Sequence, residues 1–577
     1  MNRKKIIQIL SEIATILELK GENPFKIRAY QNGARALEAM EDFEDRVSGQ
    51  TLTEIPGLGE ALSEKIITLY TTGHLEFYSK LRKSVKPGLL EMLEIPGLGG
   101  KKIKAINDAL KVGTIEELLQ ACQENKVAEI KGFGQKSQDN ILAGIHNRER
   151  YNARHLWWSA RHVALPILAG LRDLPEVELA DVAGSFRRRM ETVGDLDFIA
   201  ASPSPENVMK WFVSMESVRE VTAQGATKSS IRLKGGMQAD LRVVPREQFY
   251  YTLHHFTGSK DHNVQMRQRA LSRGLSLSEW GFSLVDGNLA PKALPETLAG
   301  ENQLFEILGL DQIPPELREG RGEIEAAEQG TLPDLIKQED LKGVFHCHTV
   351  ASDGVDRVED LLAAADERGW EYVGITDHSK ASFQANGLDE ARLLAQVEQI
   401  RTINDEGNYR SHAFAGIECD LLPDGTLDLG EEALSALDFI IASIHSSFSQ
   451  TEEEMTKRVI KALEHPLVTM IGHLSGRLLL RREPYALNIE KIVDAAAANG
   501  KIIEINANPM RMDMDWRHWR KASEKGVLGS VNPDAHDAQH FDFCETGIHV
   551  ARKGWLTAKD VLNTRSLEDV KTFFASH

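Results

Sequence analysis

Seven short apolar runs occur between residues 342 and 577, and each is followed by a segment with helix-like periodicity. The runs are 344–350, 372–378, 413–419, 439–445, 469–474, 501–508 and 527–532. Strands that alternate with helices at this spacing predict a parallel sheet. In barrels built from such a sheet, the active site collects at the carboxyl ends of the strands. The pattern therefore predicts a barrel whose functional residues follow its strands.

Six of these runs end in side chains that suit metal ions. The side chains are His346 and His348, His378, Glu418, His445, His473, and Asp534 with His536. Imidazole and carboxylate groups are ligands that manganese, zinc and iron accept in proteins. The sequence therefore predicts a metal-bearing barrel.

The first 150 residues predict helices that are punctuated by a repeated turn. The repeats, at 55–59, 95–99 and 130–134, each begin with Ile and contain a Gly-x-Gly sequence. Such a turn leaves free amides at the start of the next helix, where an anion is favoured. One copy would be an ordinary turn, but three copies resemble the helix-hairpin-helix, a module that holds nucleic-acid backbone. The resemblance implies DNA contacts at Gly57, Gly59, Gly97, Gly99, Gly132 and Gly134.

Residues 151–320 alternate strands and helices, and they carry a second group of acidic residues. Asp195 and Asp197 would lie on one face of a strand, because residues i and i+2 of a strand point the same way. Residues 230–233 and 239–244 flank Gly235-Gly236 and predict a hairpin that carries Asp240. An isolated Asp-x-Asp would more often be a solvated strand edge. With Asp240 beside it, the pair predicts a site for two divalent cations.

Composition limits the classes of protein that fit. A chain of 577 residues predicts three to five domains. It contains no apolar stretch long enough for a membrane span, and its start lacks a secretory core, so we expect a soluble, cytoplasmic protein. Four widely spaced cysteines argue against disulfides and against a thiolate zinc site. Residues 1–150 hold 22 Lys and Arg against 21 Asp and Glu, a net charge of +1, so the other 427 residues carry −19 of the chain's net −18.

Residues 1–320 resemble the family X DNA polymerases through separated motifs in the family's order. These motifs are Gly184-Ser185 with Arg188, the acids Asp195, Asp197 and Asp240, and Thr257-Gly258-Ser259 with Asn263 and Arg267. The resemblance implies that the three acids are catalytic and bind Mg²⁺ or Mn²⁺. It implies nucleotide contacts at Gly184, Ser185, Arg188, Gly194, Thr257, Gly258 and Asn263, and a DNA contact at Arg267.

The N-terminal segment is similar to the deoxyribose-phosphate lyase domain of the same family. Lys65 matches its Schiff-base lysine, and Lys26 and Tyr30 match neighbouring DNA-binding positions. Ala61 stands where the family has a phosphate-binding lysine, and a surface lysine is usually only solvated. Lyase chemistry at Lys65 and a solvated surface both remain open.

Residues 342–577 resemble the polymerase and histidinol phosphatase (PHP) domain, and no ligand position of its pattern is lost. The implied ligands are His346, His348, Asp353, His378, Glu418, His445, His473, Asp534 and His536. They would hold two or three ions of manganese, zinc or iron and hydrolyse a phosphoester. Arg477 and Arg481 are candidates for holding the phosphate or for simple solvation.

The order of these parts resembles the bacterial PolX family over nearly the whole chain. It implies a repair polymerase that fills short gaps in gapped or nicked DNA from deoxynucleoside triphosphates. The PHP domain would act as a 3′-5′ exonuclease or end-processing phosphoesterase, and action on abasic sites is a further option. Alternatives are a PHP domain that is a small-molecule phosphatase or scaffold, or a chain that mainly binds DNA ends. We expect a monomer.

The expected fold is multidomain α/β, with a helical N-terminal region, a nucleotidyltransferase palm and thumb, and a distorted seven-stranded (β/α) barrel. The expected domains are lyase-like helix-hairpin-helix (1–83), fingers with helix-hairpin-helix motifs (84–150), palm (151–244), thumb (245–320), linker (321–341) and PHP metallohydrolase (342–577).

Overall fold

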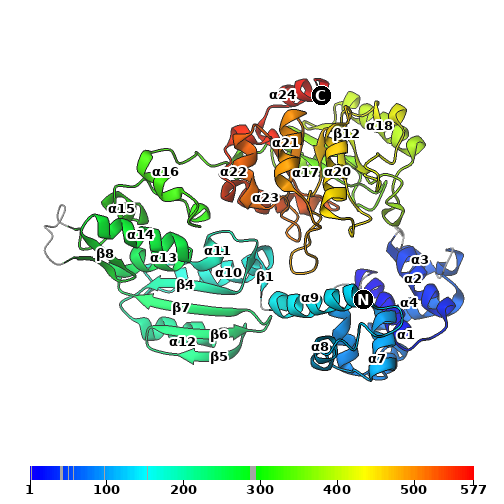
Figure 1. The fold of residues 1–577 in the computed structure, drawn as a ribbon, viewed down its shortest axis with the longest axis horizontal. Helices are drawn as coiled ribbons and strands as arrows, with labels where there is room; N and C mark the ends of the chain where they lie inside the picture. The colour runs from blue at the N-terminus through cyan, green and yellow to red at the C-terminus, as the bar shows by residue number, and fades with distance from the viewer. Residues whose placement is uncertain are drawn as a thin grey trace. The chain divides into compact units, whose positions relative to one another are not determined.

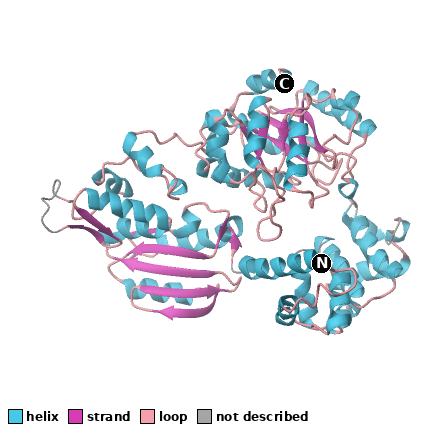
Figure 2. Cartoon of the chain, in the orientation of Figure 1, coloured by secondary structure: helices cyan, strands magenta, loops and turns pink. Residues whose placement is uncertain are grey.

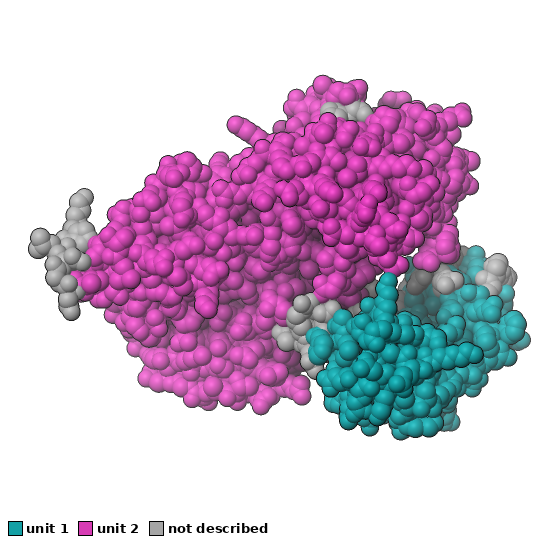
Figure 3. All heavy atoms as spheres, in the orientation of Figure 1, with its two compact units in different colours: residues 1–153 teal, residues 154–577 magenta. Residues whose placement is uncertain are grey.

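The computed structural model describes residues 1, 3–38, 43–49, 51–55, 58–95, 98–152, 154–285 and 294–576. The chain forms two compact units, residues 1–153 and 154–577, which Figure 3 shows in different colours. Every helix in the described ranges is too short or too polar to cross a membrane.

Unit 1 is helical (Figure 2). Its α-helices are α1 (Arg3–Leu19), α2 (Pro24–Glu38), α3 (Phe43–Gly49), α4 (Glu60–Thr72), α5 (Glu76–Lys83), α6 (Pro87–Glu91), α7 (Gly100–Leu110), α8 (Ile115–Gln123) and α9 (Gln135–Asn152). Helix α1 buries Leu10, Ile13 and Leu17 and contacts α2, α4, α5 and α7, so it forms the centre of the core. Each of the three glycine repeats precedes a helix, namely α4, α7 or α9, as the sequence predicts.

The first part of unit 2 is a five-stranded sheet. Its order is β2 (Leu179–Val182), β4 (Asp195–Ala201), β7 (Gln238–Val244), β6 (Lys228–Leu233) and β5 (Val218–Gln224), and only β4 and β7 pair in parallel. The predicted hairpin is β6 and β7.

Alternate residues of β4 pack on opposite faces of this sheet. Phe198 packs in one core with α10 (Trp157–Arg172) and α12 (Pro205–Ser214), while Ile199 packs against α13 (Phe249–Thr257). Asp195 and Asp197 are separated from Ile199 by even numbers of residues along β4, so they lie on the same face, which α13 covers.

The segment predicted to be the thumb follows, and its packing continues into the segment predicted to be a linker. It contains α13, α14 (Lys260–Ser272), β8 (Leu275–Ser278), β9 (Gly281–Leu284) and α15 (Glu301–Ile307). Residues 321–341 connect thumb and barrel but are packed: α16 (Glu323–Gln329) buries Ile324 and Ala327 in the thumb core, and Ile336 lies in the barrel core. The connecting segment is therefore packed, although turn residues dominate its sequence.

Residues 342–576 form the predicted barrel, which is drawn in yellow-green to red in Figure 1. Its parallel strands, in spatial order, are β10 (Gly343–Cys347), β11 (Tyr372–Ile375), β12 (His412–Asp420), β13 (Phe439–Ser443), β14 (Met470–Ile471), β15 (Ile502–Asn506) and β16 (Gly529–Asn532). Each of the seven predicted runs overlaps one of these strands. Backbone hydrogen bonds from His348 N to Ala535 O and from Ala535 N to His346 O connect the first strand of the barrel to the segment that follows its last strand, and so close the barrel.

The barrel strands are buried on both faces, which explains their continuous apolar runs. Outside them lie α17 (Val358–Glu367), α18 (Glu390–Glu406), α20 (Glu452–Leu463), α21 (Ile489–Ala498), α22 (Trp516–Glu524) and α23 (Cys544–Lys553). Phe574 of α24 (Leu567–Ala575) packs on Phe345 and Phe439 and forms a core at the end of the strands opposite the predicted ligands.

Candidate active sites

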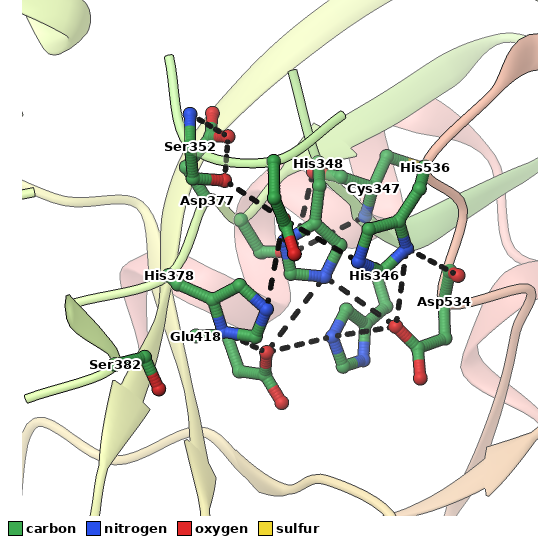
Figure 4. Close-up of polar contacts among 12 residues, drawn as sticks. His346, Cys347, His348, Ser352, Asp377, His378, Ser382, Glu418, Asp534 and His536 are labelled. Atoms are coloured by element: carbon green, nitrogen blue, oxygen red, sulfur yellow. Dashed lines mark hydrogen bonds and ion pairs between the residues drawn. The ribbon is translucent and has the colours of Figure 1, made fainter. Parts of the chain in front are cut away.

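All nine ligands predicted for the barrel gather at the carboxyl ends of its strands. Figure 4 labels six of them, namely His346, His348, His378, Glu418, Asp534 and His536. Three groups have ligand atoms within 4.8 Å of one another: His348, Asp353, His378 and His536; His346, His348 and Asp534; and His378, Glu418 and His445. The ninth, His473, places Nε2 2.8 Å from Glu418 Oε1. The groups share members, so they form one connected cluster.

Glu418 is the centre of this cluster. Its Oε2 lies 2.9 Å from His378 Nδ1, 3.5 Å from His346 Nε2 and 3.7 Å from His348 Nε2, and it is buried. Burial would raise the pKa of Glu418, but the surrounding imidazoles of His445, His346 and His378 outweigh it and hold that pKa well below its ordinary value. A carboxylate in this position can bridge cations.

Several buried atoms of the cluster lack a hydrogen-bond partner within the described structure. They are His346 Nε2, both ring nitrogens of His348, His378 Nδ1, His473 Nδ1 and Glu418 Oε2. His378 Nδ1 and Glu418 Oε2 are close, at 2.9 Å, but do not have the geometry of a hydrogen bond. Buried polar atoms are normally satisfied, so these atoms are oriented for ligands other than protein groups. Burial and the neighbours His536 and His378 lower the pKa of His348 to about 3, which keeps its ring in the neutral form that binds metal. The residues therefore fit the metal cluster that the sequence implies.

A layer of supporting residues surrounds the ligands, and the sequence analysis missed it. Glu504 accepts a 2.6 Å hydrogen bond from His473 N and lies 2.6 Å from His346 Nδ1. Asn506 Nδ2 donates to Asp534 Oδ2 at 3.1 Å. Both residues lie on β15, the strand of the one run without a predicted ligand. Their i, i+2 spacing on a strand could have identified them as facing the cluster.

An arginine also contacts the cluster, although it is not one of the two that the sequence singled out. Arg511 places Nε 3.1 Å from Asp534 Oδ2. Arg477 is buried and donates to Arg511 O and to Asp515, so its guanidinium supports this loop and is neither solvated nor free for phosphate. Arg511 is therefore the better candidate for a phosphate contact.

In the five-stranded sheet of the predicted palm, strand register places the predicted acids together. Asp197 of β4 pairs with Asp240 of β7, and Asp195 lies two residues before Asp197 on the same face. Burial, followed by the charges of Asp195 and Asp240, raises the pKa of Asp197 to about 7. Lys228 Nζ lies 3.5 Å from Asp240 Oδ2 and partly balances this charge. The site attracts cations because like charges are held close together.

Gly184 begins the predicted phosphate loop and lies against this acidic group. Its φ is +63°, and a Cβ there would come within 2.3 Å of Asp197 Oδ2, so only glycine fits. Ser185 follows in the short helix α11 (Gly184–Arg187), and Gly194 lies between β3 (Thr192–Val193) and β4. The predicted phosphate loop therefore lies directly against the acidic residues.

Arg188 connects this loop to the thumb residues predicted to contact nucleotide. Its Nη1 donates to Thr257 O at 2.8 Å, and its Nε lies 3.0 Å from Glu319 Oε1. Asn263 Nδ2 donates to Gly258 O at 3.2 Å and so holds the turn between α13 and α14. The structure therefore brings Arg188, Thr257, Gly258 and Asn263 into one region, while Arg267 is exposed on α14.

In unit 1, the three residues predicted for lyase chemistry or DNA contact surround one aromatic ring. Tyr30 stacks on Phe77 with ring centroids 6.2 Å apart, and the Nζ atoms of Lys26 and Lys65 lie 5.9 and 5.7 Å from the centroid of Phe77. The sequence analysis did not identify Phe77.

The glycine turns of unit 1 leave space at the starts of their helices. Gly59 and Gly99 are the N-cap residues of α4 and α7, and a Cβ at Gly59, Gly99, Gly132 or Gly134 would touch nothing within 4 Å. Gly132 has a φ of +90°. The remaining two predicted contacts, Gly57 and Gly97, lie outside the described residues.

Comparison with known proteins agrees with this arrangement. Family sequence models match at 1–75 (helix-hairpin-helix domain), 89–147 (SAM-like helix-hairpin-helix tandem), 252–319 (DNA polymerase beta thumb) and 345–508 (PHP domain). The DNA polymerase/3′-5′ exonuclease PolX of Bacillus subtilis (strain 168) is 39% identical over 581 residues, which cover 99% of both chains. The chain belongs to the PolX family.

Other relatives match a smaller part of the chain. A probable phosphatase of Caldicellulosiruptor saccharolyticus is 31% identical over 40% of this chain and 95% of its own length. A probable phosphatase of Acetivibrio thermocellus is 35% identical over 28% of this chain and 63% of its own length. Membership of the PolX family confirms the predicted family, and the matched helix-hairpin-helix, thumb and PHP domains confirm the predicted fold class. The roles of individual residues stay predictions.

Proposed function

We propose that this protein is a DNA polymerase that fills short gaps during DNA repair, with a metal-dependent 3′-5′ exonuclease or end-processing activity in its barrel. The family relationship supports both activities, since the Bacillus subtilis relative is named for both. The pairing of Asp197 with Asp240 beside Gly184 carries the polymerase assignment, because phosphoryl transfer requires carboxylates next to a phosphate-binding loop.

At the palm, each residue has a distinct part. Asp195, Asp197 and Asp240 would hold two Mg²⁺ or Mn²⁺ ions, which when bound neutralise charge on the attacking and leaving oxygens. Arg188 binds the outer phosphates of a deoxynucleoside triphosphate through its planar guanidinium. Gly184, Ser185 and Gly194 contact the triphosphate, and Thr257, Gly258 and Asn263 position its sugar and base.

At the barrel, the nine ligands would hold two or three manganese, zinc or iron ions, which when bound activate water and polarise a phosphoester. Glu504 and Asn506 orient His346, His473 and Asp534. Arg511 contacts the phosphate from the side of Asp534. Because the cluster is largely buried, its charges act with little screening by water.

The polymerase assignment is tested with the double variant Asp195→Ala/Asp197→Ala on a primed, gapped DNA substrate. We expect nucleotide incorporation to fall by at least 10³-fold, because removal of both carboxylates eliminates the cation site. Glu220→Ala, which removes an exposed acid from strand β5 of the same sheet, is the matched control. Incorporation that is unchanged in the double variant rules out the assignment.

The barrel assignment is tested with His346→Ala on two substrates, a labelled DNA 3′ end and a small phosphate monoester. We expect loss of nucleotide release from the DNA and little wild-type activity on the monoester. His465→Ala, outside the cluster, is the control. The relatives named as phosphatases give the alternative a basis, and efficient hydrolysis of the monoester alone would favour it.

A lyase activity at Lys65 is a second candidate, because the side chains of Lys26, Tyr30 and Lys65 all contact the ring of Phe77. The Lys65 amine would attack the sugar aldehyde of an abasic site and expel water to form a Schiff base. Borohydride should then trap a protein–DNA adduct with the wild type and not with Lys65→Ala. Lys80→Ala, an exposed lysine paired with Glu76, should retain the adduct.

The helix N-termini at Gly59, Gly99, Gly132 and Gly134 would hold DNA backbone, together with Lys26, Tyr30 and Arg267. The partners are gapped or nicked DNA and deoxynucleoside triphosphates. Metal identity, a cytoplasmic location and a monomeric state stay predictions from the sequence.

A further inference from the structure

Exposed apolar side chains follow several of the predicted metal ligands of the barrel along the chain. Within residues 342–576, which the structure describes, the exposed large hydrophobic residues are Val350, Val355, Phe383, Leu394 and Phe448. All except Leu394 lie on loops that follow predicted ligands: Val350 after His348, Val355 after Asp353, Phe383 after His378 and Phe448 after His445. Exposed apolar groups that gather beside a reactive centre indicate a binding surface.

Phe383 is the most exposed of these side chains, at 73%, yet its backbone is fixed. It begins a 3-10 turn, Phe383–Ala385, whose preceding residue Ser382 donates to Asp420 Oδ2 at 2.5 Å. Ser382 Oγ also lies 3.3 Å from Nδ1 of the ligand His445. A hydrogen-bonded turn therefore presents a mostly exposed aromatic ring directly after Ser382, the residue that contacts the predicted ligand His445.

Phe448 belongs to a stack of planar groups on the neighbouring loops. Its ring lies 5.9 Å from that of Tyr485 at an interplanar angle of 10°, and the Arg482 guanidinium lies 4.6 Å from its centroid. Tyr485 donates to the backbone oxygen of Leu474 at 2.8 Å, next to the ligand His473. The stack is therefore attached to the ligand loops, as Phe383 is.

We propose that Phe383 and the stack of Phe448, Tyr485 and Arg482 form a subsite for the unpaired bases of a DNA 3′ end. The inference rests on the proposed exonuclease function and adds the part of the substrate that is recognised. A single strand alternates phosphates with flat bases. The ligand cluster with Arg511 suits a phosphodiester, and the aromatic groups suit the faces of the next bases.

This chemistry selects one occupant. Every base has a flat face, so stacking accepts any sequence, but a base within a duplex has both faces covered by its neighbours. A small phosphate monoester would leave Phe383 exposed. The subsite therefore favours single-stranded or frayed 3′ ends over paired ends.

The test compares digestion of labelled single-stranded DNA by the full-length wild type, Phe383→Ala and Phe448→Ala. For each alanine variant we expect about a tenfold rise in KM with kcat changed less than twofold, because a base that loses its stacking partner binds less well. Phe383→Trp should restore the KM. Leu394→Ala, which removes an exposed apolar side chain from helix α18, is the matched control and should behave as wild type. Unchanged metal content and thermal unfolding show that each variant is folded.

A second substrate, with abasic residues in place of the last two nucleotides, separates stacking from a general effect on the fold. The wild type should show a raised KM on it, and Phe383→Ala should add no further rise. Two results would overturn the subsite and leave the exonuclease assignment intact. One is a wild-type KM that is the same on the normal and the abasic substrate, and the other is a Phe383→Ala variant with the same KM as Leu394→Ala. A Phe383→Ala defect confined to a small phosphate monoester overturns the subsite as well. Failure of the wild type to release nucleotides from any 3′ end refutes the exonuclease assignment itself.

Discussion

Lys553 Nζ, at the end of barrel helix α23, donates a 3.0 Å hydrogen bond to the backbone carbonyl of Arg188 in the nucleotide loop. The same ammonium group lies 2.7 Å from Glu319 Oε1, the atom that also contacts Arg188 Nε. Lys553 is buried, so water does not compete for these bonds. The barrel thus supports the loop that we predict to hold the triphosphate.

Replacement of Lys553 by Met should weaken nucleotide binding by the polymerase. The change leaves the Arg188 carbonyl and Glu319 without their buried donor, and such a loss costs about 1–3 kcal/mol. We expect the KM for deoxynucleoside triphosphates to rise about tenfold while nuclease activity stays within twofold of wild type. Steady-state incorporation on gapped DNA measures this. Lys525→Met, an exposed lysine on the barrel surface, is the control, and equal KM values for the two variants would contradict the prediction.

Cation binding at the palm should depend on pH through Asp197. Its pKa, raised to about 7 by burial and by Asp195 and Asp240, leaves the carboxyl largely protonated below pH 7. Because a cation binds only the deprotonated form, we expect Mg²⁺ affinity to fall about tenfold per pH unit below 7 and to level off above pH 8. Calorimetry in buffers of different ionisation enthalpy should detect proton release near pH 7. An affinity that is constant from pH 5.5 to 8.5 would be inconsistent with this account.

Glu301 should stabilise the junction of palm and thumb in a pH-dependent way. Burial raises its pKa, but Arg318 and Arg187 outweigh burial and hold the pKa far below its ordinary value. Arg318 Nη1 lies 2.5 Å and Arg187 Nη2 2.9 Å from its carboxylate oxygens. A depressed folded-state pKa adds stability that is complete above about pH 4.3 and is lost as the pH falls further.

We therefore expect Glu301→Gln to lower the free energy of unfolding by about 3 kcal/mol at pH 7, as breaking a buried ion pair does. The difference from wild type should shrink below pH 4. Glu306→Gln, an exposed acid on the same helix, should have little effect at either pH. Denaturant unfolding at pH 7 and pH 3.5 provides the comparison. A difference in unfolding free energy between wild type and Glu301→Gln that is larger at pH 3.5 than at pH 7 would contradict the prediction.

Glu504 should control metal affinity at the barrel although it is not a predicted ligand. It lies 2.6 Å from His346 Nδ1 and fixes the orientation of that ring. Replacement by Gln removes the charge and should weaken metal binding 10- to 100-fold, with polymerase activity retained. Metal content after dialysis against a graded chelator series measures the effect. Glu490→Gln, on the barrel surface, should match wild type; a Glu504→Gln protein that keeps its metals equally well would exclude this role.

Much of the barrel could be predicted because each buried strand appears as a continuous apolar run, and predicted ligands lie in or just after six of these seven runs. The grouping of the palm acids could also be predicted. Residue alternation puts Asp195 and Asp197 on one face of a strand, and the Gly235-Gly236 turn indicates a hairpin whose second strand carries Asp240. In the structure, Asp197 and Asp240 lie on neighbouring strands. The packing of segment 321–341 could not be predicted, because turn residues dominate its pattern while Ile324 and Ile336 supply its burial.

By itself, the sequence determined the seven barrel strands, the three glycine turns and which residues are candidate ligands and catalytic acids, because these depend on periodicity and on neighbours along the chain. Only the tertiary structure decided that Glu504 orients His346, that Phe383 stays exposed beside the cluster, and that Lys553 contacts Arg188, 365 positions away. The reason is physical: such contacts depend on how packed elements orient their side chains in three dimensions. The periodicity of a sequence does not show which elements far apart in the chain pack together.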